Sequence, residues 1–176
     1  MSSELRVGDR SETVANRILA RRAIEDVFGG GTVDAIPDVF APDAVLHLSH
    51  WGTMVKGRNA LERHVNRQHE IFSECDATVE SLLTDGDQVV AQCTVRGRHT
   101  GTLPIPGYGT FPATNNRFTA PVVYRFRIED GRIVEAWRYE DALRVAEQLG
   151  LVDRSPRERL QAFGKLLKER VFQRAG

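Results

Sequence analysis

Cysteine is scarce in this 176-residue sequence, which contains only Cys75 and Cys93. Cys75 follows a predicted helix, Cys93 lies inside a predicted strand, and the two lack the spacing of a metal-binding pair. Disulfide frameworks and zinc sites use cysteines in numbers and spacings that are absent here. We therefore interpret both as reduced, small apolar residues of a cytoplasmic protein, and we expect no metal.

The sequence also has no excess of charge of either sign. Its 24 Lys and Arg residues balance 24 Asp and Glu residues, so the formal net charge is +0. Nucleic-acid and membrane-surface partners usually select a basic excess, and neither is expected here. Balanced charge provides no repulsion between copies of the chain, which favours a homodimer or a higher homo-oligomer.

Long hydrophobic runs are absent too. No apolar run approaches the roughly 18 residues of a membrane span, and the polar first residues do not form a signal peptide. Hydrophobic residues nevertheless make up 41% of the chain, which is enough to fill a core. We therefore expect one domain with short extensions.

The hydrophobic pattern predicts helices first and a meander of strands second. Apolar residues at helical spacing predict helices at 14–28, 33–40, 57–73 and 141–149. Strand-like runs bounded by turn signals predict strands at 44–49, 77–83, 89–99, 118–128 and 133–139. This order indicates an α+β fold in which helices cover the concave face of a curved antiparallel sheet.

Both ends of the chain lie outside the predicted domain, which covers residues 13–152. Residues 1–12 are expected to form a disordered tail. Ser155, Pro156 and Glu158 are agreeing helix-start signals, so residues 153–176 are predicted to form a C-terminal helical extension. We expect this helix to pack on its own subunit or on a neighbour. A lid over a pocket is the alternative, and mixed charges argue against a membrane-surface helix.

The stretch Val89–Asn116 is the strongest candidate for a functional site. A strand-like run ends at His99, and a loop with three prolines and three glycines follows from Gly101 to Pro112. Histidine has an ordinary pKa near neutrality, and a strand end beside a loop is a common place for chemistry.

Partial burial would keep His99 neutral so that it can act as a base. A hydrogen-bonded wall residue without proton transfer is the alternative. If His99 points inward, the alternating residues do too: Gly97, Val95, Cys93 and Ala91.

The last predicted strand supplies candidate substrate-binding residues. Ile133, Glu135, Trp137 and Tyr139 share one strand face. If that face is inward, Trp137 is a stacking wall for a planar ligand and Tyr139 donates a hydrogen bond to a carbonyl. Plain core packing is the alternative for Trp137. Asp141 is expected to cap the following helix rather than to act in catalysis.

A second histidine and three further aromatic residues complete the candidate set. His47 has inward parity on the first predicted strand, which makes it the second candidate for proton transfer, and Trp51 lies just beyond that strand. Tyr108 and Phe111 belong to the Gly/Pro-rich loop, where they could fold over the mouth of a pocket or form a surface or subunit contact. His47 and His50 differ in strand parity, so they are not expected to form a metal pair.

Several of these residues belong to a pattern that is typical of one family. The pattern consists of Gly97-x-His99-x-Gly101, Pro112-x-Thr114, an aromatic residue at Phe118, Phe126-x(4)-Gly131-x-Ile133-x-Glu135-x-Trp137-x(3)-Asp141, and Gln148-Leu149-Gly150. From Thr13 to Leu151 the chain resembles the SnoaL-like polyketide cyclases of the nuclear-transport-factor-two-like superfamily. The resemblance implies a cone-shaped α+β fold with an apolar pocket, a homodimer formed through the sheet, and neither cofactor nor metal.

The resemblance also implies a reaction. The type reaction is the intramolecular aldol closure of a polycyclic aromatic polyketide ester, and the histidine of the Gly-x-His motif, here His99, lines the pocket. The acid/base aspartate of the type enzymes follows the Pro-x-Thr turn, and Asn115 takes that place here. Because an amide cannot accept a proton at neutral pH, we expect the substrate to supply much of its own acidity, as β-dicarbonyl compounds do.

Two other functions compete with a cyclase or isomerase. An epoxide hydrolase or epoxide-opening cyclase on the same fold would need paired carboxylates around a water, and the sequence offers only one at an expected pocket position, Glu135, because Asp141 is expected to cap a helix. A non-catalytic binding or assembly module is favoured by the missing aspartate. An enclosed cavity of roughly 300–1,000 Å³, bordered by the candidate residues named above, would favour the enzyme.

Overall fold

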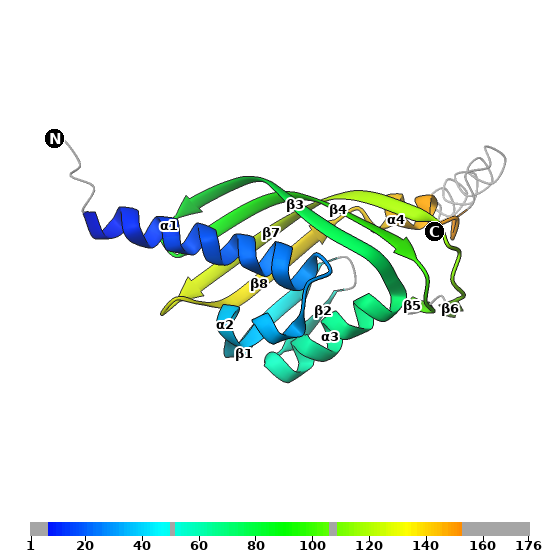
Figure 1. Ribbon diagram of the computed structural model, residues 1–176, viewed down its shortest axis with the longest axis horizontal. Coiled ribbons are helices and arrows are strands. Elements are labelled where there is room, and N and C mark those ends of the chain that lie inside the picture. Colours follow the sequence, from blue (N-terminus) through cyan, green and yellow to red (C-terminus); the bar gives the residue numbers. More distant parts are fainter. Residues whose placement is uncertain (1–6, 50–51, 106–108, 153–176) are drawn as a thin grey trace, which may run out of the picture.

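The chain combines a large curved sheet with short helices (Figure 1). The computed structural model describes residues 7–49, 52–105 and 109–152. Its helices are α1 (Val7–Arg22), the π-helical segment η1 (Ala23–Phe28), the 3-10 turn η2 (Val33–Ala35), α2 (Ile36–Val39), α3 (Arg58–Ile71) and α4 (Ala142–Gln148). Its strands are β1 (Phe40–Leu48), β2 (Thr53–Lys56), β3 (Phe72–Asp85), β4 (Gln88–His99), β5 (Leu103–Ile105), β6 (Gly109–Phe111), β7 (Arg117–Glu129) and β8 (Arg132–Glu140).

Six strands form an open sheet in the order β2-β1-β8-β7-β4-β3, and β5 pairs with β6 in a separate hairpin. All neighbours in the large sheet are antiparallel except β1 and β8, which run parallel, so the prediction of a wholly antiparallel sheet is wrong at this pair. Register shifts between Ser73 and Asp76 and between Val79 and Ser81 mark irregularities in β3, and such bulges bend a strand. The sheet curves without closing, and the α+β fold is confirmed.

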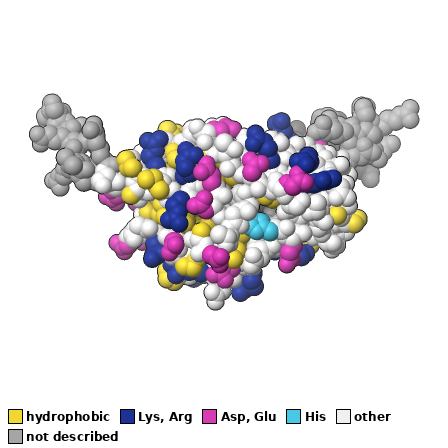
Figure 2. Space-filling model, in the orientation of Figure 1, with side chains coloured by type: hydrophobic (Ala, Val, Ile, Leu, Met, Phe, Trp, Pro, Cys, Tyr) yellow, Lys and Arg dark blue, Asp and Glu magenta, His cyan; other side chains and the backbone are white. Residues whose placement is uncertain are grey.

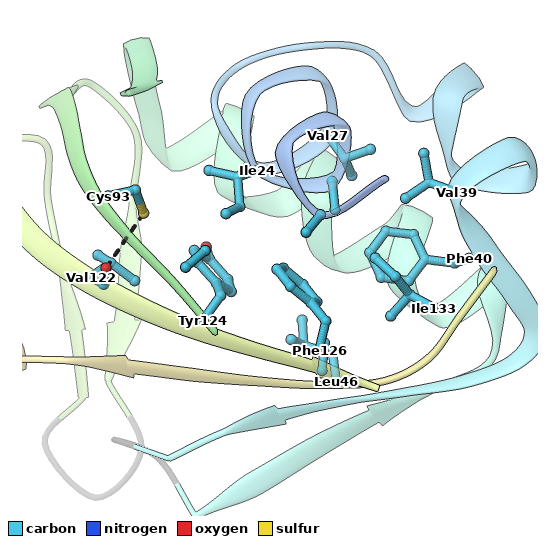
Figure 3. Close-up of a cluster of buried hydrophobic side chains, with 14 of the residues drawn as sticks. Ile24, Val27, Val39, Phe40, Leu46, Cys93, Val122, Tyr124, Phe126 and Ile133 are labelled. Atoms are coloured by element: carbon cyan, nitrogen blue, oxygen red, sulfur yellow. Dashed lines mark hydrogen bonds between the residues drawn. The ribbon is translucent and has the colours of Figure 1, made fainter. Parts of the chain in front are cut away.

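Apolar side chains fill the concave side of the sheet, under α1, η1 and α3 (Figures 1 and 3). Every second residue of β7 from Phe118 to Ile128 is buried, as the alternating pattern predicts. Ile24 and Val27 of η1 are buried in the same cluster as Tyr124 (Figure 3). The core therefore lies between the helical N-terminal segment and the middle of the sheet.

The first helical segment, α1 followed directly by η1, ends at the predicted place but begins earlier than predicted. Its C-cap is Gly29, the first of three consecutive glycines. It begins at Val7, so the part of the expected 1–12 tail from Val7 onward is helical. The next predicted helix ends at Val39 because Phe40 is buried and already belongs to β1.

Two short strand pairs were not predicted from the hydrophobic pattern. The Gly/Pro-rich loop after His99 contains the β5–β6 hairpin, and β2 pairs with β1 just before α3. Each of these strands is too short to show a clear alternation of apolar and polar residues. The predicted C-terminal helix at 153–176 lies outside the described residues.

Charged groups of both signs are interspersed on the surface (Figure 2). Exposed ion pairs such as Arg96 with Asp76, at 3.2 Å, and Arg67 with Glu70, at 2.9 Å, join neighbouring side chains. Pairs of this kind contribute little to stability in water. Within the part of the chain that the structure describes, no helix is long and apolar enough to cross a membrane.

Candidate functional site

An apolar cavity of about 310 Å³ lies between the concave face of the sheet, α3 and α4. This volume is at the lower end of the usual range for small-molecule sites. Residues of the sheet, of both helices and of β5 line it. Its apolar wall includes Phe28, Val65, Phe72, Val95, Phe118 and Leu149.

The polar residues of the lining include one ion pair. Arg138 Nη2 donates to Glu140 Oε2 at 2.5 Å, and both residues line the cavity. The two side chains are only 16% and 11% exposed, so the pair is largely withdrawn from water. Burial opposes the charge of Arg138, but Tyr124 and Glu140 outweigh this effect and raise the pKa of the guanidinium above its usual value. Arg138 therefore stays charged.

Tyr124 packs next to this pair on the neighbouring strand β7. The Arg138 guanidinium carbon lies 5.9 Å from the centre of the Tyr124 ring, and that ring stacks on Phe28 with centroids 5.2 Å apart. Tyr124 is completely buried, and burial raises the pKa of its hydroxyl. Tyr124 Oη and Arg138 Nε are both buried without a hydrogen-bond partner among the described residues. Such groups are uncommon in folded proteins and call for an explanation.

A β-bulge in β8 decides which residues face this cavity. Ile133 pairs with Ile128, whereas Glu135 pairs with Arg127, so Val134 is an extra residue without a partner on β7. The extra residue inverts the alternation of side chains after Ile133. Ala136, Arg138 and Glu140 consequently take the concave side.

The predicted inward orientation of Glu135, Trp137 and Tyr139 is therefore wrong. These side chains lie on the convex face of the sheet, opposite the cavity, and none of them lines it. Arg138 and Glu140 were missed for the same reason. The sequence of β8 contains no glycine or proline that would mark the bulge.

His47 also lies on the convex face, in a cluster with the misassigned residues. Its Nε2 is 2.8 Å from Glu135 Oε1, and its ring stacks on Trp137 with centroids 5.1 Å apart. Arg125 covers Trp137 at 4.2 Å, and Arg127 pairs with Glu135 at 3.3 Å. The hydrogen bond from His47 lowers the pKa of Glu135, with Arg127 adding to the effect and slight burial opposing it. His47 is thus placed away from the cavity that would need a proton acceptor.

His99 has the predicted inward orientation but does not line the cavity. It is completely buried, and its ring lies 5.8 Å from that of Phe72, which does line the cavity. The backbone N–H of Thr114 donates to His99 Nδ1 at 3.3 Å, and the Thr114 hydroxyl lies 3.1 Å from the same atom. His99 Nε2 is buried without a partner in the described structure. Burial lowers the pKa of His99, and a backbone interaction with Gly101 partly opposes it.

Asn115 serves the turn that holds His99. Its backbone N–H donates to the His99 carbonyl at 2.9 Å, and its own carbonyl accepts from Arg98 Nε at 3.1 Å. Its φ of 59° is in the left-handed region, which Asn tolerates better than most residues. The side chain is exposed and does not line the cavity. This geometry agrees with a turn residue.

The remaining candidates are placed as follows. Phe111 is half-buried on β6 and does not line the cavity. Trp51 and Tyr108 lie outside the described residues. Asp141 caps α4 by accepting a hydrogen bond from the N–H of Arg144 at 3.0 Å, as predicted. No group of three or more potential metal ligands occurs within residues 7–49, 52–105 and 109–152.

Comparison with solved structures identifies the same fold in several bacterial proteins. A protein from Jannaschia sp. CCS1 assigned as a SnoaL-like polyketide cyclase superposes with a TM-score of 0.70 at 22% identity, covering 81% of this chain and 96% of that chain. IdmH from Streptomyces antibioticus, assigned as a polyketide cyclase, gives 0.63 at 27% identity, with 77% and 98% covered. AclR from Streptomyces galilaeus, assigned as a hydroxylase, gives 0.66 at 20% identity, with 93% and 99% covered. No curated protein matches the sequence significantly.

The family profile of the SnoaL-like polyketide cyclases matches residues 18–149. This span runs from α1 into the C-cap of α4, and it includes Arg138 and Glu140 of the cavity lining and the neighbouring Tyr124. The fold of the solved neighbours agrees with it. The chain therefore belongs to the SnoaL-like polyketide cyclase family and has the nuclear-transport-factor-two-like fold.

Proposed function

We propose that this protein is a cyclase or isomerase that closes a ring in a hydrophobic carbonyl compound of the polyketide type. The cavity between α3 and α4 carries the proposal, because its wall is apolar except for a few polar groups that include the Arg138–Glu140 pair. An apolar wall suits a hydrocarbon skeleton, and fixed charges in a dry site stabilise charge that develops on a carbonyl oxygen.

The chemistry of an aldol-type closure is simple enough for such a site. A proton leaves the carbon beside one carbonyl, the resulting enolate carbon bonds to a second carbonyl carbon, and the second oxygen takes up a proton. No electrons are gained or lost overall, so the reaction asks for acid/base help and orientation. A cavity that holds a reactive chain folded supplies the orientation.

His99, Asn115 and His47 do not transfer the proton in this proposal. His99 is buried behind Phe72, and Asn115 and His47 are outside the cavity. Transfer of a proton needs hydrogen-bond reach between the base and the substrate. We therefore propose that His99 and Asn115 support the structure at one end of the cavity. His47 belongs to the convex face of the sheet.

A cavity-filling substitution tests the proposal. Ala146→Phe places a large ring in the cavity from α4, and we expect turnover of a linear aromatic polyketide ester to fall at least about tenfold because the substrate loses its space. Leu143→Phe is the matched control, since Leu143 is 60% exposed on the same helix and does not line the cavity. Product is measured by liquid chromatography with mass detection, without added cofactor.

Two outcomes would reject the proposed function. Equal turnover in both variants would show that chemistry takes place elsewhere. Tight binding of the ester with no product in the wild type would favour a binding module. Epoxide opening receives no support from the geometry, because Glu140 is the only carboxylate that lines the cavity in the described part of the chain, and a pair is required.

A further inference from the structure

On the basis of the proposed function, we propose that Arg138 binds the enolate oxygens that form when the substrate loses a proton. The residue lines the cavity from β8, in the middle of the sheet. Neither the position nor the residue type belongs to the motif by which the sequence resembles its family.

The hydrogen-bonding state of Arg138 supports this assignment. Of its three side-chain nitrogens, only Nη2 has an acceptor among the described residues, namely Glu140. Nε is buried without an acceptor and is not accessible from the cavity, so the fork formed by Nη1 and Nη2 is the edge that a ligand could use. A guanidinium presents its donors as a planar fork that matches two oxygens held in one plane. A β-dicarbonyl enolate offers such a pair of oxygens, and its negative charge is shared between them.

The surroundings of Arg138 favour an anionic oxygen over a neutral one. Tyr124 lies beside the guanidinium, but its hydroxyl is fully buried and Tyr124 does not line the cavity, so Arg138 is the donor of the two that a ligand would meet. Glu140 is the one carboxylate in the lining that opposes a second anion, and it is already engaged by Nη2. Other titratable or charged groups near Arg138 or in the cavity lining are Cys75, Cys93, His64, Arg67 and His69.

The proton balance of the enolisation step is complete without a strong protein base. The C–H bond between the two carbonyls breaks, its electron pair is delocalised over both oxygens, and the proton leaves to water. Arg138 keeps its own proton throughout and stabilises the new charge at low dielectric. A site in which water takes the proton and Arg138 stabilises the charge fits a chain in which Asn115 stands in the place of an acid/base aspartate.

A spectroscopic titration tests the proposal with benzoylacetone, an apolar β-diketone whose enolate has its own ultraviolet absorbance. We expect the wild type to bind the enolate at least about tenfold tighter than the neutral form, which lowers the apparent pKa of the bound probe by about 1. The analogue with two methyl groups on the central carbon has no hydrogen between its two carbonyls and cannot form the enolate that both oxygens share, so it serves as a probe of binding alone.

Three variants separate charge from folding. Arg138→Met with Glu140→Gln removes both partners and leaves no stranded buried charge, and we expect it to lose the enolate preference while still binding the dimethyl analogue. Arg138→Lys keeps a charge without the fork, and a reduced preference is expected. Glu140→Gln leaves Arg138 uncompensated, so the apparent pKa of the bound probe should fall further. Circular dichroism checks the fold of each variant.

The outcomes distinguish this proposal from the proposed function. If the double variant lowers the pKa of bound benzoylacetone as much as the wild type does, Arg138 is not the enolate site, but the cavity still takes carbonyl compounds. A wild type that binds both probes without lowering the pKa of benzoylacetone leads to the same conclusion. If neither probe binds the wild type, the cavity does not accept hydrophobic carbonyl ligands, and the proposed function fails as well.

Discussion

His99 illustrates how a buried contact determines the protonation state of a single residue. Because the N–H of Thr114 donates to Nδ1, that nitrogen is an acceptor and the proton of the neutral ring resides on Nε2. Burial lowers the pKa of the ring, which favours the same neutral form. The contact ties the end of β4 to the turn before β7, as do the backbone hydrogen bonds between His99 and residues 115–116.

The pKa of His99 predicts a pH dependence of stability. Its pKa is lower in the folded chain than the ordinary value of 6.5, so the unfolded chain binds the proton more readily. The stabilising contribution is complete above about pH 6.5 and is lost as the pH falls through the folded pKa. We expect the free energy of unfolding, measured with urea, to decrease between pH 7.5 and pH 5.

His99→Asn is the matched variant for this measurement. Asn can place its side-chain oxygen near the position of Nδ1, where it would accept from the N–H of Thr114, but it does not titrate. We expect the variant to lose stability less steeply than the wild type as the pH falls. Parallel pH profiles for the two proteins would show that His99 does not contribute to the dependence.

At the scale of the element, α4 is fastened to the sheet by two side chains, those of Gln148 and Asn116. Gln148 Nε2 donates to the carbonyl of Thr119 at 3.1 Å, and Gln148 Oε1 accepts from the N–H of the same residue at 3.0 Å. Asn116 adds a hydrogen bond to the carbonyl of Leu149 at 3.0 Å. Because α4 is only seven residues long, these contacts rather than helix propensity hold it over the cavity.

Loss of the Gln148 contact should affect ligand binding without any change in the lining. We expect Gln148→Ala to cost about 1 kcal/mol of stability and to weaken binding of a cavity ligand severalfold, because α4 is released from β7. Arg144→Ala on the same helix is the control. Calorimetric titration with benzoylacetone provides the measurement, and equal affinities for the two variants would contradict the prediction.

The elements also show what could be predicted from the sequence and what could not. The alternation on β4 correctly placed the inner face of that strand, because it continues without interruption from residue 91 to residue 99. The same reasoning failed on β8, because an unmarked bulge at Val134 inverted the parity of every later residue. The position of Asp141 as a cap needed only its place before a helix, and that local signal was sufficient.

At the scale of the whole molecule, the cavity could not be derived from local patterns. Its lining comes from segments that are distant in the sequence, such as Phe28, Cys75 and Leu149, and their convergence depends on the curvature of the sheet. The family resemblance predicted an apolar pocket, and the cavity agrees with it. It did not predict Arg138 and Glu140 as the charged groups inside.

The convex face of the sheet is the surface through which we propose that two copies associate. Val123 and Tyr139 face each other across β7 and β8, and they are 38% and 45% exposed. Exposed apolar side chains near the middle of a sheet favour burial against a partner, and a balanced net charge does not oppose it.

A pair of charges on this face tests the proposed dimer. We expect Val123→Asp with Tyr139→Asp to convert a dimer to a monomer in analytical ultracentrifugation, because four like charges would meet at the interface. Leu143→Asp introduces a charge on α4, at another exposed apolar residue, and should leave the dimer intact. A wild type that sediments as a monomer would refute the proposal directly.

The bulge in β8 has a consequence for the loss of a single codon from this strand. The strand holds one residue more than its antiparallel neighbour requires, so it contains a spare position. If the codon for Glu135 were lost, Val134 could take its place opposite Arg127, and Arg138 and Glu140 would still face inward. A shortening of the strand at this position should therefore preserve the inner charges and change the outer face only beside His47, the partner of Glu135.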